Sequence, residues 1–159
     1  MTMNVWTVGT TIVGLGLAVW GILAIPTAPA APAVENRITS PSEADRVDMC
    51  LPAMRGTGPV PDEGSLWLVV HGVGNQGYYL ARQVQPGTDE GWDIGPTQIG
   101  SKDSKEGQRY ELLLWRLDPQ LTGVVSHMIK DMRVFDGLPP GASLADHKTV
   151  IRTADKNPC

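Results

Sequence analysis

Short apolar runs separated by turn-forming sequences are the feature that most limits how this 159-residue chain can fold. The separating sequences TGPVPDEG, GNQG, PGTDEG, GSKDSKEG and LPPGA are rich in glycine and proline. Such residues interrupt helices and long strands, so their spacing predicts an all-β sandwich rather than alternating strands and helices. The strands are expected at Val47–Gly56, Ser65–Val73, Tyr78–Gln85, Trp92–Ile99, Tyr110–Leu117 and Ser143–Thr153.

The run YELLLWRL is expected to be a central strand. Successive side chains of a strand point to opposite faces, and here both sets are largely apolar. One face carries Tyr110, Leu112, Leu114 and Arg116, and the other carries Leu113, Trp115 and Leu117.

One amphipathic helix is predicted at about 118–133. Asp118 can cap its N-terminus and Pro119 can occupy its first position. Gly137 and Pro139 follow as stop signals. The apolar stripe, expected to pack against the sandwich, follows helical spacing through Leu121, Val124, Val125, Met128, Ile129 and Met132.

The N-terminal part of the chain has the composition of a membrane segment. Residues 1–34 carry no charge, and Val5–Ile25 as a helix would extend about 30 Å, the thickness of the hydrocarbon layer. Trp6 and Trp20 lie toward its ends, where indole rings favour the interface. The predicted organisation is a transmembrane anchor or uncleaved signal at 1–25, a Pro/Ala-rich linker at 26–36 and an Ig-like β-sandwich domain at 37–159.

Two alternatives to the anchor stay open. The sequence TAPAAPA offers small residues at a spacing that suits signal-peptide cleavage. However, no Lys or Arg precedes the apolar run, and the run is longer than that of a usual signal peptide. A buried core helix is the other alternative, and the prolines of Pro26–Pro32 disfavour it by separating the segment from the rest of the chain.

The two cysteines indicate the compartment. Cys50 lies near the start of the folded part and Cys159 at its last residue, as expected for a disulfide that ties the two ends together. Closing so long a loop stabilises a domain in an oxidising compartment. Arg37 is the one basic residue just after the span, and under the positive-inside rule it would instead place the C-terminal part in the cytoplasm. We place the domain outside the cytoplasm, on a single-pass cell-membrane protein.

The run Leu66–Gln83, LWLVVHGVGNQGYYLARQ, imitates two enzyme motifs. HGVG resembles the oxyanion turn of an α/β-hydrolase, but no serine lies in G-x-S-x-G. GVGNQG matches the dinucleotide fingerprint G-x-G-x-x-G, but Pro86–Gly87 would end the following helix early. The acidic residues that should hold a ribose lie instead in the turn PGTDEGWD.

A β-hairpin accounts for the same residues with fewer requirements. GNQG tolerates the positive φ angles of a tight turn, and strand-forming residues flank it. Gly72 and Gly74 would permit a bulge or a close backbone approach. His71 is expected to be an ordinary polar residue at a strand end.

From PSEADRVDMCLPAMRGTG through GSLWLVV, YYLARQVQPGTDEGWD, YELLLWRLD and LPPGASLADHKTVIRT, the chain resembles uncharacterised bacterial membrane-anchored extracytoplasmic Ig-like β-sandwich domains. The resemblance covers roughly residues 38–153. Its motifs concern the framework, so it implies a fold and carries over no catalytic residues. HGVGNQG at the hairpin departs from that pattern.

The sequence therefore predicts a non-catalytic envelope protein that presents a β-sandwich for binding. No cofactor and no metal site is expected, because the histidines are dispersed, and no basic cluster points to nucleic acid. The membrane, through residues 5–25, and an envelope or membrane protein are the expected partners. The alternative is a small hydrolase-like or dinucleotide-binding enzyme using HGVGNQG; an accessory role, with the span packing through Gly14, Gly16 and Ala18, is a third. The candidate binding loops comprise His71, Gly72, Gly74, Asn75, Gln76, Gly77, Ser101, Lys102 and Asp103.

Overall fold

The computed structural model describes residues 35–87, 91–128 and 133–159. This part of the chain is mainly β, with several sheets and one helix, as the turn spacing predicts. The predicted membrane segment at 5–25 and nearly all of the linker lie outside the described residues. Within the described ranges, no helix has the length and hydropathy needed to cross a membrane.

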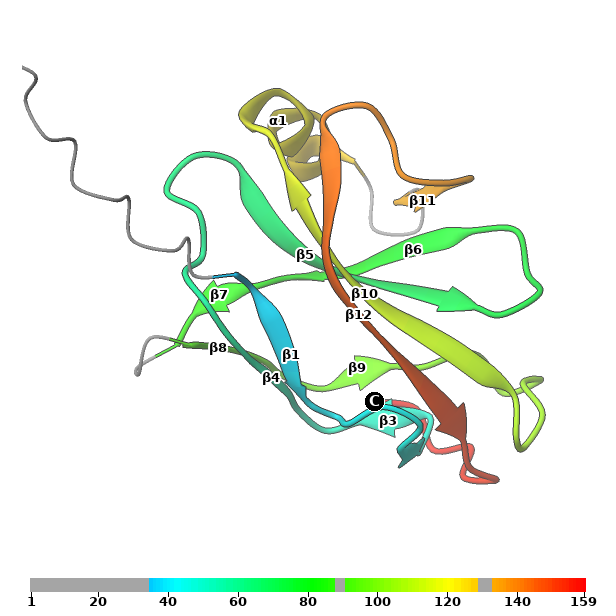
Figure 1. Ribbon diagram of the computed structural model, residues 1–159. Coiled ribbons are helices and arrows are strands. Elements are labelled where there is room, and N and C mark those ends of the chain that lie inside the picture. The colour runs from blue at the N-terminus through cyan, green and yellow to red at the C-terminus, as the bar shows by residue number, and fades with distance from the viewer. Residues whose placement is uncertain (1–34, 88–90, 129–132) are drawn as a thin grey trace, which may run out of the picture. The chain divides into compact units, whose positions relative to one another are not determined.

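A six-stranded sheet forms the centre of the domain (Figure 1). Its neighbouring strands are antiparallel, except for the parallel pair β12–β2. The order of strands is β11 (Val134–Phe135), β6 (Tyr78–Gln83), β5 (Ser65–Gly72), β10 (Arg109–Leu117), β12 (Ala142–Arg152) and β2 (Arg46–Val47).

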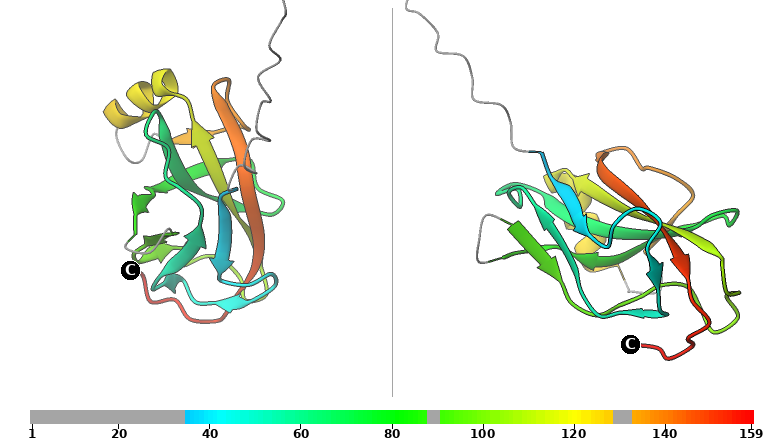
Figure 2. Two further views of the ribbon diagram at one scale, coloured as in Figure 1. Left: turned by 60° about the vertical axis from the view of Figure 1, so that its left-hand side comes forward. Right: turned by 60° about the horizontal axis from the view of Figure 1, so that its bottom comes forward.

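Two smaller sheets pack against one face of this sheet (Figure 2). The first has the order β1 (Arg37–Ser40), β4 (Met54–Thr57), β8 (Gly91–Ile94) and β7 (Gln85–Pro86), and the second pairs β3 (Cys50–Leu51) with β9 (Thr97–Gln98). The first hydrophobic core fills the space between the layers. It includes Ile38, Met54, Trp92 and Ile94 from the small sheets and Leu66, Leu68, Leu112, Leu114 and Val150 from the large one.

The opposite face of the six-stranded sheet carries a second hydrophobic core. Leu113, Trp115 and Leu117 point into it, whereas Tyr110, Leu112 and Leu114 point into the first core. The alternation predicted for YELLLWRL is therefore confirmed, and β10 is an interior strand between β5 and β12. Arg116 is exposed, and its guanidinium donates to Asn36 Oδ1 at 2.6 Å.

Helix α1 (Pro119–His127) covers part of the second core, as the apolar stripe predicts. Asp118 caps it, because its carboxylate accepts a hydrogen bond from the Leu121 N–H at 2.7 Å. Val125 is fully buried, but Val124 is 57% exposed, so its assignment to the buried stripe was wrong. Ile129 and Met132 lie outside the described residues.

The predicted C-terminal end of the helix was also wrong. Helix α1 stops at His127, and Met128 already has extended dihedral angles. The hydroxyl of Ser126 and the Nδ1 atom of His127 both bond the carbonyl of Gly123. Side chains that bond the last turn's carbonyls compete with continuation of the helix, and a glycine within it lowers its stability.

Three predicted strands are each divided. Val47–Gly56 is divided among the separate strands β2, β3 and β4. Strand β2 pairs with β12, β3 with β9, and β4 with both β1 and β8. Trp92–Ile99 breaks at Gly95–Pro96, where proline has no N–H to donate to a ladder. Tyr78–Gln85 ends as β6 at Gln83, because the chain then passes to the other sheet as β7. The very short or polar strands β1 and β11 were not predicted.

The disulfide prediction is confirmed. Cys50 in β3 is bonded to Cys159, with 4.8 Å between the Cα atoms and a sequence separation of 109. The bond fixes the C-terminal segment beside β3 (Figure 1).

Candidate functional site

The glycine-rich run after β5 is a hairpin turn. Strands β5 and β6 pair antiparallel on either side of it, and the Asn75 N–H donates to the Gly72 carbonyl at 2.9 Å. Gly74 has φ +89°, a conformation that glycine adopts readily. The residues after Gly77 form strand β6, so no helix begins there to hold a pyrophosphate. The strand–turn–helix context of the dinucleotide fingerprint is therefore missing at this run.

The loop at 100–107 is ordered by its own serines. The Ser104 hydroxyl accepts a hydrogen bond from the Ser101 N–H at 2.8 Å and lies 2.7 Å from the Tyr110 hydroxyl. The Ser101 hydroxyl accepts from the Asp103 N–H at 3.2 Å. These bonds fix the orientation of the two serine hydroxyl groups.

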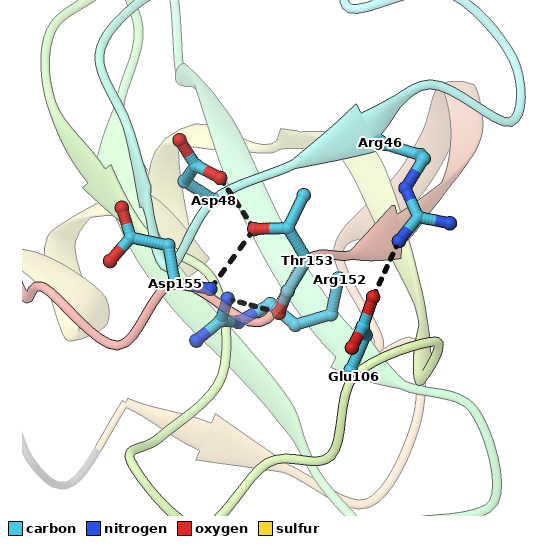
Figure 3. A network of polar contacts seen from close by, with 6 residues as sticks. All are labelled: Arg46, Asp48, Glu106, Arg152, Thr153 and Asp155. Atoms are coloured by element: carbon cyan, nitrogen blue, oxygen red, sulfur yellow. Dashed lines mark hydrogen bonds and ion pairs between the residues drawn. The ribbon is translucent and has the colours of Figure 1, made fainter.

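Arg152, drawn in Figure 3 with its bond to the Thr153 carbonyl, also bonds backbone groups at both ends of this loop. Its side chain is fully buried, and its Nε donates to the Ile99 carbonyl at 3.0 Å, next to the loop's first residue. Its own carbonyl accepts from the Gly107 N–H at 2.9 Å. One Nη atom donates to the Thr153 carbonyl, and the other has no hydrogen-bond partner within the described ranges. Arg152 is thus a buried residue whose hydrogen bonds hold the two ends of the loop in place.

The hairpin and the loop at 100–107 border one cleft of about 890 Å³. Tyr110 of β10 lies between them and touches both. A Cβ atom on Gly72 would come within 3.3 Å of the Tyr110 ring, and one on Gly100 would lie 2.3 Å from its hydroxyl. Glycine at these two positions therefore allows the loops to approach the tyrosine.

The cleft is lined mainly by neutral polar groups and two arginines. Amides and hydroxyls come from Asn75, Gln98, Ser101, Ser104, Gln108 and Tyr110. Arg82 and Arg133 add positive charge, Asp103 is the one acidic side chain that the described residues contribute, and the last residue, Cys159, also lines the cleft. Such convergent donors and acceptors are typical of a site that fixes the orientation of a polar ligand.

The structure brings together four of the nine predicted site residues. Gly72 and Asn75 from the hairpin meet Ser101 and Asp103 from the second loop at the cleft. The remaining five do not line it; they are His71, Gly74, Gln76, Gly77 and Lys102.

His71 lies at the end of strand β5, as predicted, but it is largely buried and does not line the cleft. It is 9% exposed, it bonds the Gly77 carbonyl through Nδ1 at 3.0 Å, and its ring stacks on Tyr78 at 4.1 Å. Tyr78 in turn stacks on Trp115 of the second core. Alternation along β5 therefore points His71 away from the cleft that Val70 and Gly72 line.

Sequence reasoning missed the arginines of the cleft. Arg133 lies over the Trp67 ring, with 5.1 Å from Cζ to the ring centroid, and Arg82 belongs to β6. They are 51 positions apart in sequence and belong to no recognisable motif. Only the pairing of β6 with the segment before β11 brings them together.

Comparison with protein-family models, curated proteins and solved structures finds no match. The chemistry of the cleft is therefore the main guide to its use. In the residues that the structure describes, no group of histidine, cysteine and acidic side chains is placed to hold a metal ion. No histidine described here lines the cleft, so its serine hydroxyls have no neighbouring imidazole to accept a proton.

Proposed function

We propose that this protein is a membrane-anchored, non-catalytic binding protein of the cell envelope, whose Ig-like β-sandwich domain binds a ligand in the cleft beside Tyr110. The layered sheets with one shared core support the sandwich assignment. The uncharged span at 5–25 supports the anchor, and the Cys50–Cys159 disulfide supports an oxidising compartment outside the cytoplasm.

The convergence of two loops on one polar cleft carries the proposal. The hairpin and the loop at 100–107 come from different parts of the chain, and each is held by hydrogen bonds to its own residues or to Arg152. A cleft whose walls are fixed before binding loses less conformational entropy when a ligand enters. Loops on a rigid scaffold are the usual place for recognition.

Site-specific photo-crosslinking in intact cells tests this proposal. A benzophenone amino acid replaces Gln108, which lines the cleft, in the full-length chain. The control carries it at Lys148, a half-buried residue of β12 that does not line the cleft. We expect a defined adduct from position 108 that is absent from position 148. No adduct at 108, or equal adducts at both positions, would contradict a binding role for the cleft.

A further inference from the structure

One end of the cleft is formed by two segments that the structure describes without a gap. It is lined by parts of the hairpin at 72–79 and of the facing segment at 96–110, and we call it the hairpin end of the cleft. Strand β11 pairs with β6 at Tyr78 and Tyr79, so the edge of the sheet is already occupied here. A peptide therefore has no free strand to join at this end.

Tyr110 connects the two sides of the hairpin end. It lies opposite Gly72 in the antiparallel pair of β5 and β10. The Asn75 amide lies against Gly72, because a Cβ atom on that glycine would overlap the amide nitrogen. At the hydroxyl end of the tyrosine, the Ser104 Oγ atom lies 2.7 Å away. An amide and a hydroxyl from two different loops thus converge on one buried aromatic ring.

The polar groups of the hairpin end both donate and accept hydrogen bonds. Asn75 is exposed and Gln108 is half-buried, and the side chains of both line the cleft. Each amide offers two donors and one acceptor, and a serine hydroxyl such as that of Ser104 offers both functions as well. Sugar hydroxyls have the same double character, so they match this lining.

Tyr79 adds an apolar surface at the same end. Its side chain is 54% exposed and lines the cleft. In a pyranose whose hydroxyls are all equatorial, the C–H groups form two flat apolar faces. Such a face can pack on an aromatic ring while the hydroxyls at the sugar's edge remain available to polar groups.

The charge of the hairpin end disfavours phosphorylated ligands. In the described lining, 72–79 and 96–110 contribute no lysine or arginine, and Asp103 is their one acidic side chain. Arg82 lies farther along β6, and the Arg133 guanidinium is held over Trp67 of the second core. Phosphate recognition relies on cationic groups, whereas a neutral sugar needs none.

We propose that the hairpin end of the cleft binds a neutral oligosaccharide made of pyranose units with equatorial substituents. One unit packs its C–H face on the Tyr79 ring, and its hydroxyls bond the amides of Asn75 and Gln108. This inference rests on the proposed function and specifies the ligand's class.

Titration calorimetry with defined sugars tests the inference on the full-length, disulfide-bonded chain, in a detergent without a sugar headgroup. The probes are cellotetraose and chitotetraose, whose β-1,4-linked units carry equatorial substituents. One comparison ligand is the permethylated form of each sugar, which keeps the rings but lacks hydroxyl donors. The other is a serine–glycine octapeptide, which has hydroxyls and amides but no sugar ring. We expect saturable binding of at least one probe, with a Kd of about 1 mM or tighter, and no binding of the comparison ligands.

Two pairs of variants locate the site. Asn75→Ala should weaken sugar binding roughly tenfold, whereas Gln76→Ala removes an amide from the next position, outside the lining, and should leave the affinity nearly unchanged. Tyr79→Ala should also weaken binding roughly tenfold, and Tyr79→Phe, which keeps the ring, should bind almost as well as the native chain. All four side chains are exposed in the native domain, so the melting temperature should stay close to the native value.

Binding of neither probe, unchanged binding after methylation, equal binding of the octapeptide, or equal losses from Asn75→Ala and Gln76→Ala would overturn the inference. In each case an adduct from position 108 in cells would still support the cleft as a binding site for another ligand. If that crosslinking also fails, the proposed function itself is wrong.

Discussion

Removing the Cys50–Cys159 disulfide should lower the stability of the domain more than most single changes. The bond closes a loop of 109 residues. In the chain-entropy model, releasing a loop of this length restores enough freedom to the unfolded chain to cost about 4.7 kcal/mol at 25 °C. For a domain of this size, that loss corresponds to a fall in Tm of about 15–20 °C.

Loss of the cysteine side chains themselves should add little to this loss of stability. Cys50 is half-buried and Cys159 is exposed, so serine at either position leaves no cavity in a core. The variants are Cys50→Ser, Cys159→Ser and the double substitution in the full-length chain. All three should melt at the same lowered temperature, and reductant should bring the native chain to that temperature without affecting the variants.

Differential scanning calorimetry under oxidising and reducing conditions measures the effect. A fall of less than about 5 °C would refute the reasoning, because the unfolded chain would then gain little freedom from losing the link. A double variant much less stable than either single one would show that the two side chains contribute separately from the bond.

Three further changes test the loops and the helix. Gly100→Ala should lower the free energy of unfolding by about 3 kcal/mol, because alanine is strained at this positive φ and its Cβ would overlap the Tyr110 hydroxyl. Gly107→Ala should lower it by about 1 kcal/mol, because φ is similar but the added Cβ meets no other atom. Urea denaturation measures both values. Asp118→Ala should cost about 1 kcal/mol through loss of the helix cap, and restoring the cap with Asn should recover most of it. Val125→Ala should lower the free energy of unfolding by about 2 kcal/mol, and Val124→Ala by less than about 0.5 kcal/mol; equal losses would contradict the assigned helix face.

Features set by neighbouring residues could be predicted from the sequence. The alternation along β10 follows from the period of a strand, and the start of α1 follows from the Asp–Pro pair at 118–119. The hairpin at GNQG could be predicted because these residues tolerate the positive φ angles of a tight turn. Each of these signals lies within a few residues of the structure it specifies.

Features set by distant pairing could not be predicted. Nothing local divides Val47–Gly56 into three strands, because each piece is defined by a partner far along the chain. Burial of His71 depends on stacking with Tyr78 across the hairpin, which a hydrophobicity pattern does not encode. The cleft lies between two predicted loops, but Arg82 and Arg133 line it only because β6 pairs with the segment before β11.

The position of Trp67 beneath the Arg133 guanidinium gives the domain a built-in optical reporter. Indole emission responds to a charge held over the ring, and Trp67 lines the hollow in which that charge lies. A molecule that draws Arg133 away from the ring would alter the fluorescence of this one indole. Unlabelled compounds could therefore be screened directly, with Arg133→Gln as the variant that should no longer respond.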